Sequence, residues 1–233
     1  MKSVLLTGAG GGIGNAVLSG LLAADANRVL AVTNTTKPAQ FLTPQSTSKR
    51  LISKSVDLSS YAEISGLQKY VENKNISFDW IVMAHGYIDH ETVLEDQSRE
   101  NIIRTFEVNI MSIIYLCQGF IKKLNGSGGI ISISSTAGLT ANGKYAVYSA
   151  SKAAVNNFMQ ALARNRPDFS FVSVCAGPTR TPMLDKIRGD PASAQGSSVV
   201  ADLVLRIISE NNFCKSGDIL TVRDGQVNVE NSI

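Results

Sequence analysis

The chain has 233 residues, of which 44% are hydrophobic and 18% charged, a balance that is typical of folded globular proteins and excludes a disordered chain. The formal net charge of +3 is small and the basic residues are scattered, so we expect no nucleic-acid partner. The three cysteines lie far apart, no apolar run approaches a membrane span, and the first such run ends at Gly8, too soon for a signal-peptide core. We therefore expect a soluble, cytoplasmic protein with reduced thiols and no membrane partner.

The first structural signal is a glycine-rich turn between an expected strand, 2–7, and an apolar stripe at helical spacing. Glycines let the backbone approach a pyrophosphate, and the first turn of a helix offers it unpaired N–H groups. A glycine cluster alone is a weak signal, because tight turns also use glycine, but its place at the first strand–helix junction favours a dinucleotide site. The residues expected to hold the cofactor here are Gly8, Gly10, Gly12, Ile13 and Gly14.

The end of the second expected strand, 28–32, bears on which dinucleotide binds. An acidic residue about 20 residues after the glycines commonly binds the ribose 2′-hydroxyl of NAD. This chain instead has Thr33, Asn34 and a small polar run that ends at Lys37, with no acid. Such a run suits a 2′-phosphate better than a bare diol, so we expect NADP in preference to NAD. Ordinary loop residues are the alternative interpretation.

The rest of the chain alternates strands with helices, which predicts a parallel sheet with helices on both faces. No linker, repeat or low-complexity segment interrupts this alternation. We therefore expect an α/β, Rossmann-type doubly wound sheet of about seven strands, in a single domain over 1–233 that carries both the cofactor and the substrate sites. The further expected strands are 51–56, 78–84, 129–134, 171–175 and 218–222, and the expected helices include 60–71, 99–124 and 199–210.

The most informative chemical signal is Tyr148, which lies four residues before Lys152 at the start of an apolar stripe with helical spacing. Residues at i and i+4 lie on one helix face, so the phenol and the ammonium should share one space. A unit charge about 5 Å away at an effective dielectric near 20 is worth roughly 3 kcal/mol, or about two pKa units. We therefore expect the pKa of Tyr148 to be lowered toward neutrality, where a phenol can act as a general acid or base.

Together these features resemble the short-chain dehydrogenase/reductase family, over nearly the whole chain. The turn that begins Thr7-Gly8 matches the TGxxxGxG pattern of the family, and Asn109, Ser135, Tyr148 and Lys152 match its Asn-Ser-Tyr-Lys tetrad. One of these matches could be an ordinary turn, surface or packing residue, but hardly all four in register. Further positions that match cofactor-binding residues of the family are Asp57, Leu58, Ala84, His85, Gly86, Gly177, Pro178 and Thr181.

The resemblance implies a carbonyl–alcohol interconversion by hydride transfer to or from a nicotinamide. In that chemistry Tyr148 exchanges the proton, Ser135 holds the substrate oxygen, Lys152 binds the nicotinamide ribose, and Asn109 helps to hold a water that links Lys152 to solvent. The resemblance also implies a small-molecule carbonyl or alcohol substrate and a homodimer or homotetramer. Tyr145 competes as the catalytic phenol but is followed at i+4 by Ser149, so we expect Tyr145 to line the substrate pocket instead.

Several alternatives remain open from the sequence. Ser134 competes with Ser135, and the family spacing favours Ser135. His85 replaces a usual motif residue and would place an imidazole near the ribose, with no role that the sequence reveals. His85 and His90 lack a clear third ligand, so we expect no metal. A cofactor sensor without turnover and a nucleotide-sugar epimerase or dehydratase are the rival functions. Basic residues that could favour an anionic substrate, although solvated surface charge explains them better, are Lys144, Arg180, Lys186 and Arg188.

Overall fold

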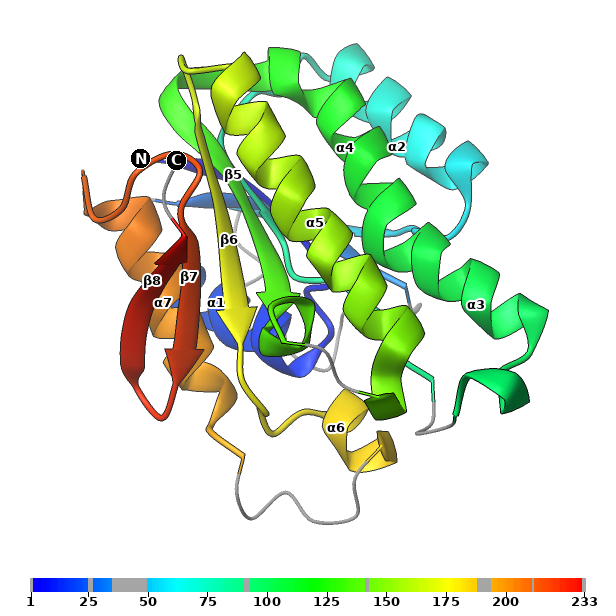
Figure 1. Ribbon diagram of the computed structural model, residues 1–233. Helices are drawn as coiled ribbons and strands as arrows, with labels where there is room; N and C mark the ends of the chain where they lie inside the picture. Colours follow the sequence, from blue (N-terminus) through cyan, green and yellow to red (C-terminus); the bar gives the residue numbers. More distant parts are fainter. Residues whose placement is uncertain are drawn as a thin grey trace.

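The computed structural model describes residues 2–24, 27–34, 50–89, 93–140, 143–187, 194–210 and 212–231. Its strands form one eight-stranded sheet in the order β3-β2-β1-β4-β5-β6-β7-β8, in which only the last pairing is antiparallel (Figure 1). The Rossmann-type doubly wound α/β fold expected from the alternation is therefore confirmed. The strands are β1 (Ser3–Thr7), β2 (Arg28–Thr33), β3 (Leu51–Ser55), β4 (Phe78–Met83), β5 (Leu124–Ser135), β6 (Ser170–Ala176), β7 (Ile219–Arg223) and β8 (Gln226–Asn231).

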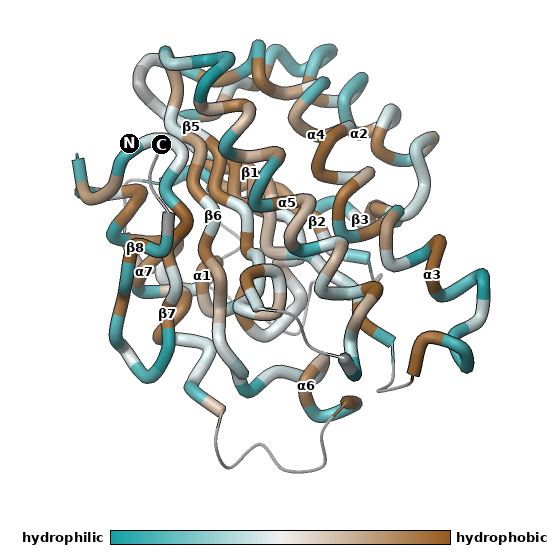
Figure 2. Tube along the Cα trace, viewed as in Figure 1, coloured by the Kyte–Doolittle hydropathy of each residue, from teal (hydrophilic) through white to brown (hydrophobic). Residues whose placement is uncertain are grey.

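Two layers of helices cover the sheet, and each has its own hydrophobic cluster. Successive side chains of a strand point to opposite faces, so Val4 and Leu6 of β1 pack in one cluster with α1 and α7, whereas Leu5 packs in the other with α2, α4 and α5. Figure 2 shows the apolar residues gathered on the strands and on the inward helix faces. The helices are α1 (Gly12–Ala23), α2 (Tyr61–Asn73), α3 (Arg99–Phe106), α4 (Ser112–Phe120), α5 (Ala146–Asn165), α6 (Pro182–Ile187) and α7 (Ser197–Ser209).

The estimate of about seven strands is wrong by one, because β8 pairs with β7 as a hairpin. Asp224 and Gly225 form the turn, with φ angles of 50° and 80°. Both values are positive, as a two-residue hairpin turn requires, and Asp-Gly is a strong sequence signal for such a turn. That signal was present in the sequence and could have predicted β8.

The expected helix 99–124 is also wrong in detail, because it is not one helix. α3 gives way to a π-helical turn, Glu107–Met111, before α4 begins, and a short 3-10 turn then leads into β5 at Leu124. An inserted π turn commonly marks a functional position. Here it contains Asn109, whose side chain it turns into the interior.

The carboxyl ends of β1 and β4 meet where the sheet reverses its winding direction, the place where open α/β sheets bind ligands. Gly8 directly follows β1 with φ of +69°, and a Cβ on it would lie 2.5 Å from the backbone nitrogen of His85. Only glycine therefore allows this close approach of the two strand ends. Within the described residues, no helix is both long enough and apolar enough to cross a bilayer.

Candidate active site

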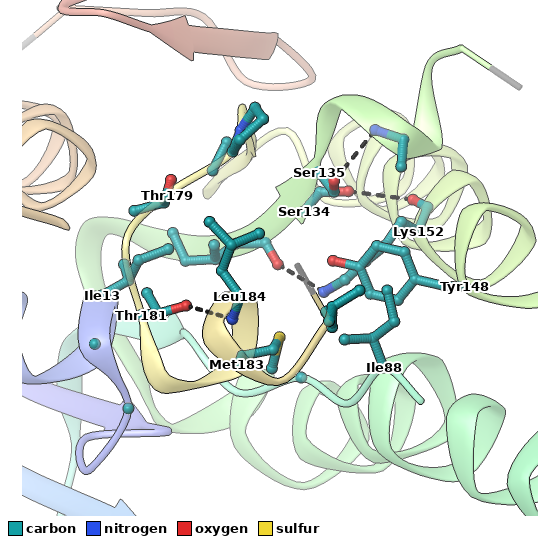
Figure 3. A pocket seen from close by; sticks show the side chains of 18 of the residues that line it. Ile13, Ile88, Ser134, Ser135, Tyr148, Lys152, Thr179, Thr181, Met183 and Leu184 are labelled. Atoms are coloured by element: carbon teal, nitrogen blue, oxygen red, sulfur yellow. Dashed lines mark hydrogen bonds between the residues drawn. The ribbon is translucent and has the colours of Figure 1, made fainter. Parts of the chain in front are cut away.

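A cavity of about 350 Å³ opens at the carboxyl ends of β1, β4, β5 and β6 (Figure 3). Its volume lies in the range of small-molecule sites. The glycine turn before α1 borders it on one side, and the loop around α6 borders it on another. The pocket therefore brings the expected cofactor residues and the expected reactive residues to one place.

Three members of the expected tetrad line this cavity: Ser135, at the end of β5, and Tyr148 and Lys152, both on α5. In Figure 3 the Tyr148 hydroxyl and the Lys152 amine turn toward the same space. The Lys152 Nζ lies 5.8 Å from the centre of the Tyr148 ring and donates a hydrogen bond to the Ile133 carbonyl at 3.0 Å. The helical spacing thus places the phenol and the amine together as expected.

The expected lowering of the Tyr148 pKa is not seen. Burial raises the pKa of Tyr148 to about 12, although the hydrogen bond with the Ser135 side chain lowers it in part. Burial likewise lowers the pKa of Lys152 to about 8. Desolvation penalises both charged forms, and here it outweighs the attraction that the spacing alone suggested. Tyr148 is therefore protonated at neutral pH.

The two candidate serines have different partners. Ser134 is buried, and its hydroxyl donates to the Lys152 carbonyl at 3.2 Å, which ties β5 to α5. The Ser135 oxygen accepts a hydrogen bond from the backbone N–H of Ala137 at 3.1 Å, and its hydroxyl also interacts with Tyr148. Ser135 is therefore the serine placed beside the phenol, as the spacing predicted.

Asn109 does not line the cavity but lies fully buried behind it on the π turn. Its Oδ1 accepts from the Tyr87 N–H at 2.7 Å, and its Nδ2 donates to the Tyr87 carbonyl at 2.8 Å and to the Ser151 hydroxyl at 2.9 Å. Ser151 in turn donates to the Tyr148 carbonyl at 2.7 Å. Asn109 thus connects the π turn to the segment after β4 and to α5.

Gly86 lies beside the ends of two of these side chains. The point where a Cβ on Gly86 would stand is 3.4 Å from the Lys152 Nζ and 3.5 Å from the Asn109 Oδ1. The two polar atoms therefore face the same small space, which a side chain at position 86 would fill.

The expected cofactor residues fall into two groups. Those in the first group line the cavity: Gly10, Gly12, Ile13, Ala84, His85, Gly86, Tyr148, Lys152, Gly177, Pro178 and Thr181. Gly8, Gly14, Thr33, Asn34, Asp57 and Leu58 are not among its lining residues. Gly8 and Gly14 belong to the turn itself, and Gly10 lies against Thr33, since its Cβ would be 3.5 Å from the Thr33 Cγ2. The second group therefore lies outside the cavity, and its part in cofactor binding stays a prediction.

The geometry of the turn fits a phosphate group. The N-cap of α1 is Gly11, which has no side chain to bond the first N–H groups of the helix. Uncapped N–H groups at a helix N-terminus bind anions. After β3, Asp57 accepts hydrogen bonds from the Ser59 N–H at 2.9 Å and the Ser59 hydroxyl at 2.8 Å. After β2, Asn34 is exposed. The positions 35–37 lie outside the described residues.

His85 lines the cavity, but both of its ring nitrogens are bonded within the protein. Nδ1 lies 2.6 Å from the Thr7 hydroxyl and Nε2 lies 2.7 Å from the Ser112 hydroxyl. Because Ser112 already donates to the Val108 carbonyl at 2.6 Å, Nε2 must donate to Ser112. Burial, followed by the charge of Lys152, lowers the pKa of His85 to about 3, so the imidazole is neutral and Nδ1 accepts from Thr7.

The hydrogen-bonded bridge of Thr7, His85 and Ser112 is a feature that the sequence did not reveal. It joins the end of β1 to Ser112, the first residue of α4, whose hydroxyl bonds back to Val108 within the π turn that carries Asn109. Thr7 and Ser112 are 78 and 27 residues from His85 in the chain, so no local pattern could show it. In the described part of the chain no cluster of His, Cys, Asp or Glu could hold a metal, and His90 lies outside it.

The wall of the cavity away from the glycine turn is largely apolar. Of the basic residues that could have attracted an anion, Lys144, Arg180 and Lys186 are exposed and do not line the cavity, and Arg188 lies outside the described residues. Tyr145, the expected substrate residue, does line it. The apolar residues on this side include Ile88, Ile133, Ala137, Met183, Leu184 and Ile187.

Comparison with known proteins decides the family. A sequence model described as short chain dehydrogenase matches residues 2–192. The chain belongs to this family. It is therefore an oxidoreductase that acts on CH–OH or carbonyl groups, and its matched segment includes the glycine turn, Ser135, Tyr148 and Lys152.

Relatives of this short-chain dehydrogenase include a benzil reductase that forms (S)-benzoin, from Saccharomyces cerevisiae, which is 26% identical over 76% of this chain and 70% of its own. An acetoacetyl-CoA reductase from an Acinetobacter strain is 26% identical over 96% of this chain and 97% of its own. Among solved structures, a short-chain dehydrogenase from Burkholderia cenocepacia in complex with NADP has a TM-score of 0.82 and 25% identity, covering 96% of each chain. A 4-hydroxyisoleucine dehydrogenase with NADH has a TM-score of 0.85 at 21% identity, covering 97% of this chain and 98% of its own.

Proposed function

We propose that this short-chain dehydrogenase interconverts a neutral carbonyl compound and its secondary alcohol with NADP or NAD, and that one domain over 1–233 carries both sites. The observation that supports this most is the meeting of Ser135, Tyr148 and Lys152 in a cavity that the glycine turn also lines. The uncapped start of α1 suits the pyrophosphate of a dinucleotide. When bound, such a cofactor supplies or accepts the hydride.

In the reducing direction, Tyr148 donates its phenolic proton to the carbonyl oxygen while the carbonyl carbon receives the hydride. The phenol carries this proton at neutral pH. Ser135 hydrogen-bonds the same oxygen as negative charge develops on it. In the oxidising direction the phenolate takes the proton of the alcohol, and the hydride leaves the carbon.

Lys152 serves the proton transfer and the cofactor together. Its amine would bind the nicotinamide ribose, and its charge would favour the phenolate that Tyr148 becomes after it gives up the proton. The space beside Gly86 that Lys152 shares with Asn109 would hold a water, through which the phenolate is reprotonated from solvent. Asn109 positions this route through its bonds to Tyr87 and Ser151.

NADP is the proposed cofactor in preference to NAD. No acid follows β2, where Thr33 is buried beside Gly10 and Asn34 is exposed. A carboxylate there would hydrogen-bond a ribose diol and repel a 2′-phosphate. Titration with NADPH and NADH, followed by nicotinamide fluorescence, tests this preference, and tighter binding of NADH would overturn it.

The substrate is proposed to be uncharged, because Lys152 is the one formally charged side chain among the described residues that line the cavity. Equal turnover of matched neutral and anionic carbonyl compounds would contradict this.

A homodimer or homotetramer is proposed from the family resemblance, and a monomer on a sizing column at micromolar concentration would count against it.

The central experiment is cofactor oxidation against a panel of aliphatic and aromatic ketones, with Tyr148→Phe as the control. Turnover that depends on the phenol supports the proposal, whereas full turnover by Tyr148→Phe would overturn the mechanism. Tight cofactor binding without turnover on any substrate would favour the cofactor sensor instead.

A further inference from the structure

Gln195 has a buried side-chain amide that joins two distant segments of the chain. It stands two residues before α7, is 6% exposed, and lies beyond the segment that the family model matches. Its Nε2 donates to the Thr179 hydroxyl at 3.2 Å and to the Val222 carbonyl at 3.1 Å, and its Oε1 accepts from the Asp224 N–H at 2.9 Å. A backbone N–H only donates and a carbonyl only accepts, so these partners fix the orientation of the amide. Both N–H groups and the oxygen of the amide are therefore bonded within the protein.

Thr179 carries this connection to the cavity. Its oxygen accepts from Gln195, and its own hydroxyl donates to the Gly177 carbonyl at 2.9 Å. Figure 3 shows Thr179 and Thr181 along one stretch of chain at the border of the cavity. The bonds of Gln195 therefore reach residues that line the cavity, some of which are expected cofactor residues. The lining residues of this stretch are Gly177, Pro178, Thr179 and Thr181.

The same stretch of chain touches the glycine turn. A Cβ on Gly12 would lie 2.5 Å from the Thr181 Cγ2, so the two sides of the cavity are in contact there. The Thr181 hydroxyl also accepts from the Leu184 N–H at 3.2 Å, within α6. A shift of the segment 177–181 therefore changes the width of the cavity beside the glycine turn.

After β6 the chain leaves the sheet, and Gln195 holds it there. The Gln195 N–H donates to the Pro178 carbonyl at 3.0 Å, and the Gln195 carbonyl accepts from the Arg180 N–H at 2.9 Å. Through its side chain the same residue is bound to β7 and to the turn between β7 and β8. The β7–β8 hairpin is therefore the support to which this wall of the cavity is bonded.

We propose that Gln195 is a positioning residue for the cofactor, which acts through Thr179 to hold the segment 177–181 in its binding position before the cofactor arrives. This inference rests on the proposed function, because it takes the cavity to bind a nicotinamide cofactor. A wall that is already in place does not have to be ordered on binding, and such preorganisation strengthens affinity. Gln195 does not line the cavity, so it takes no part in the proton transfer.

The test replaces the amide with an apolar group of similar size, in Gln195→Leu, and measures cofactor binding by nicotinamide fluorescence. The cofactor is whichever of NADPH and NADH the wild type binds more tightly. Loss of the bond to Thr179 should weaken binding about fivefold, the worth of one neutral hydrogen bond. The value of kcat at saturating cofactor should fall by less than about twofold, since the reactive residues are unchanged. A variant that is less stable in urea but binds the cofactor as tightly as the wild type would show a purely structural role and overturn the proposal.

Two further variants make this result specific. Gln68→Leu removes a similar bond, to the Tyr115 carbonyl at 2.8 Å between α2 and α4, and should leave cofactor affinity as in the wild type. Thr179→Val removes only the hydroxyl, so it tests the same link if Gln195→Leu does not fold, and it should also weaken binding about fivefold. Adding Gln195→Leu to Thr179→Val should weaken binding by less than about twofold more, because residues of one connection are not additive. Two losses that multiply would overturn the proposal, since Gln195 would then not act through Thr179.

A measurement without ligand separates failure of this inference from failure of the proposed function. Amide hydrogen exchange in the ligand-free protein reports how readily the segment 177–181 opens. Exchange there should be faster in Gln195→Leu than in the wild type and in Gln68→Leu, and equal exchange in all three overturns the inference. The proposed function fails separately, if neither NADPH nor NADH binds to the wild type.

Discussion

The two halves of the cavity are built in different ways. On the side of the glycine turn, the backbone and satisfied polar side chains form the site: His85 has both nitrogens bonded, and Ser134 and Asn109 hold α5 and the π turn. On the substrate side the wall is mostly apolar and Tyr145 has an unpaired hydroxyl. The first half is therefore held together by side-chain hydrogen bonds within the protein, whereas the second half is shaped mainly by the packing of apolar side chains.

The largest expected effect comes from removing the reactive group of the substrate side. Tyr148→Phe deletes the proton donor, and general acid catalysis contributes about 10²–10⁴ to the rate, so kcat should fall by that factor. The dissociation constant of the cofactor should change by less than about threefold, because Lys152 and the glycine turn remain. Steady-state kinetics measures kcat and a fluorescence titration measures cofactor binding. A loss of cofactor affinity as large as the loss of kcat would contradict the prediction that the two halves act independently.

The next largest effect is expected from replacing His85, which is part of the hydrogen-bonded half of the cavity. His85→Ala removes a buried ring and leaves Thr7 and Ser112 without their partner, which should lower the free energy of unfolding by about 2–4 kcal/mol. His85→Gln supplies an amide that can both donate and accept, and should recover part of this loss. Urea unfolding measures both variants. Equal stability of His85→Ala and the wild type would show that the bridge is not structural.

Acid should weaken the same bridge in a predictable direction. The pKa of His85 is about 3 in the folded protein and 6.5 in the unfolded chain, so between these values the unfolded chain binds a proton that the folded protein does not. The stability that His85 contributes is therefore complete above pH 6.5 and falls toward pH 3 by about 1.4 kcal/mol per pH unit. Urea unfolding between pH 7.5 and 4.5 should show a shallower fall for His85→Gln than for the wild type. Parallel curves would refute the neutral, buried imidazole.

The smallest effect is expected at Asn34, after β2, where a substitution should change the preference between NADPH and NADH. Asn34→Asp introduces the carboxylate that the chain lacks after β2, which should weaken NADPH binding about fivefold by charge repulsion and strengthen NADH binding, since surface charge pairs are worth about 1 kcal/mol. Asn73→Asp, at the exposed end of α2 and outside the residues that line the cavity, makes the same chemical change and serves as the control. Competitive titration with both cofactors measures the preference, and an unchanged ratio would place the 2′ position elsewhere.

The parts that the sequence predicted are those carried by local patterns. The strand–turn–helix junction at Gly8 and the i, i+4 pair of Tyr148 and Lys152 depend on neighbours in the chain, and both are where the sequence placed them. The β8 hairpin is also encoded locally, by the turn residues Asp224 and Gly225, although the expected sheet of about seven strands did not include it.

Other features depend on contacts that no local pattern contains. The direction of the Tyr148 pKa shift depends on burial by the whole fold, which the four-residue spacing cannot express. The π turn at Asn109 keeps the apolar periodicity of a continuous helix, so periodicity alone could not reveal it. The role of His85 needs two partners from distant elements, which meet only when β1, β4 and α4 are assembled.

The bridge of Thr7, His85 and Ser112 also constrains how this position can vary among relatives. A neutral imidazole at position 85 is stable only while hydroxyl groups stand at both positions 7 and 112, since losing either leaves a buried ring nitrogen unpaired. Homologues with histidine at position 85 should therefore have serine or threonine at position 112. Homologues with a small apolar residue at position 85 should be free to vary at position 112. Substitution at these two sites should thus be correlated across the family, although they lie 27 residues apart.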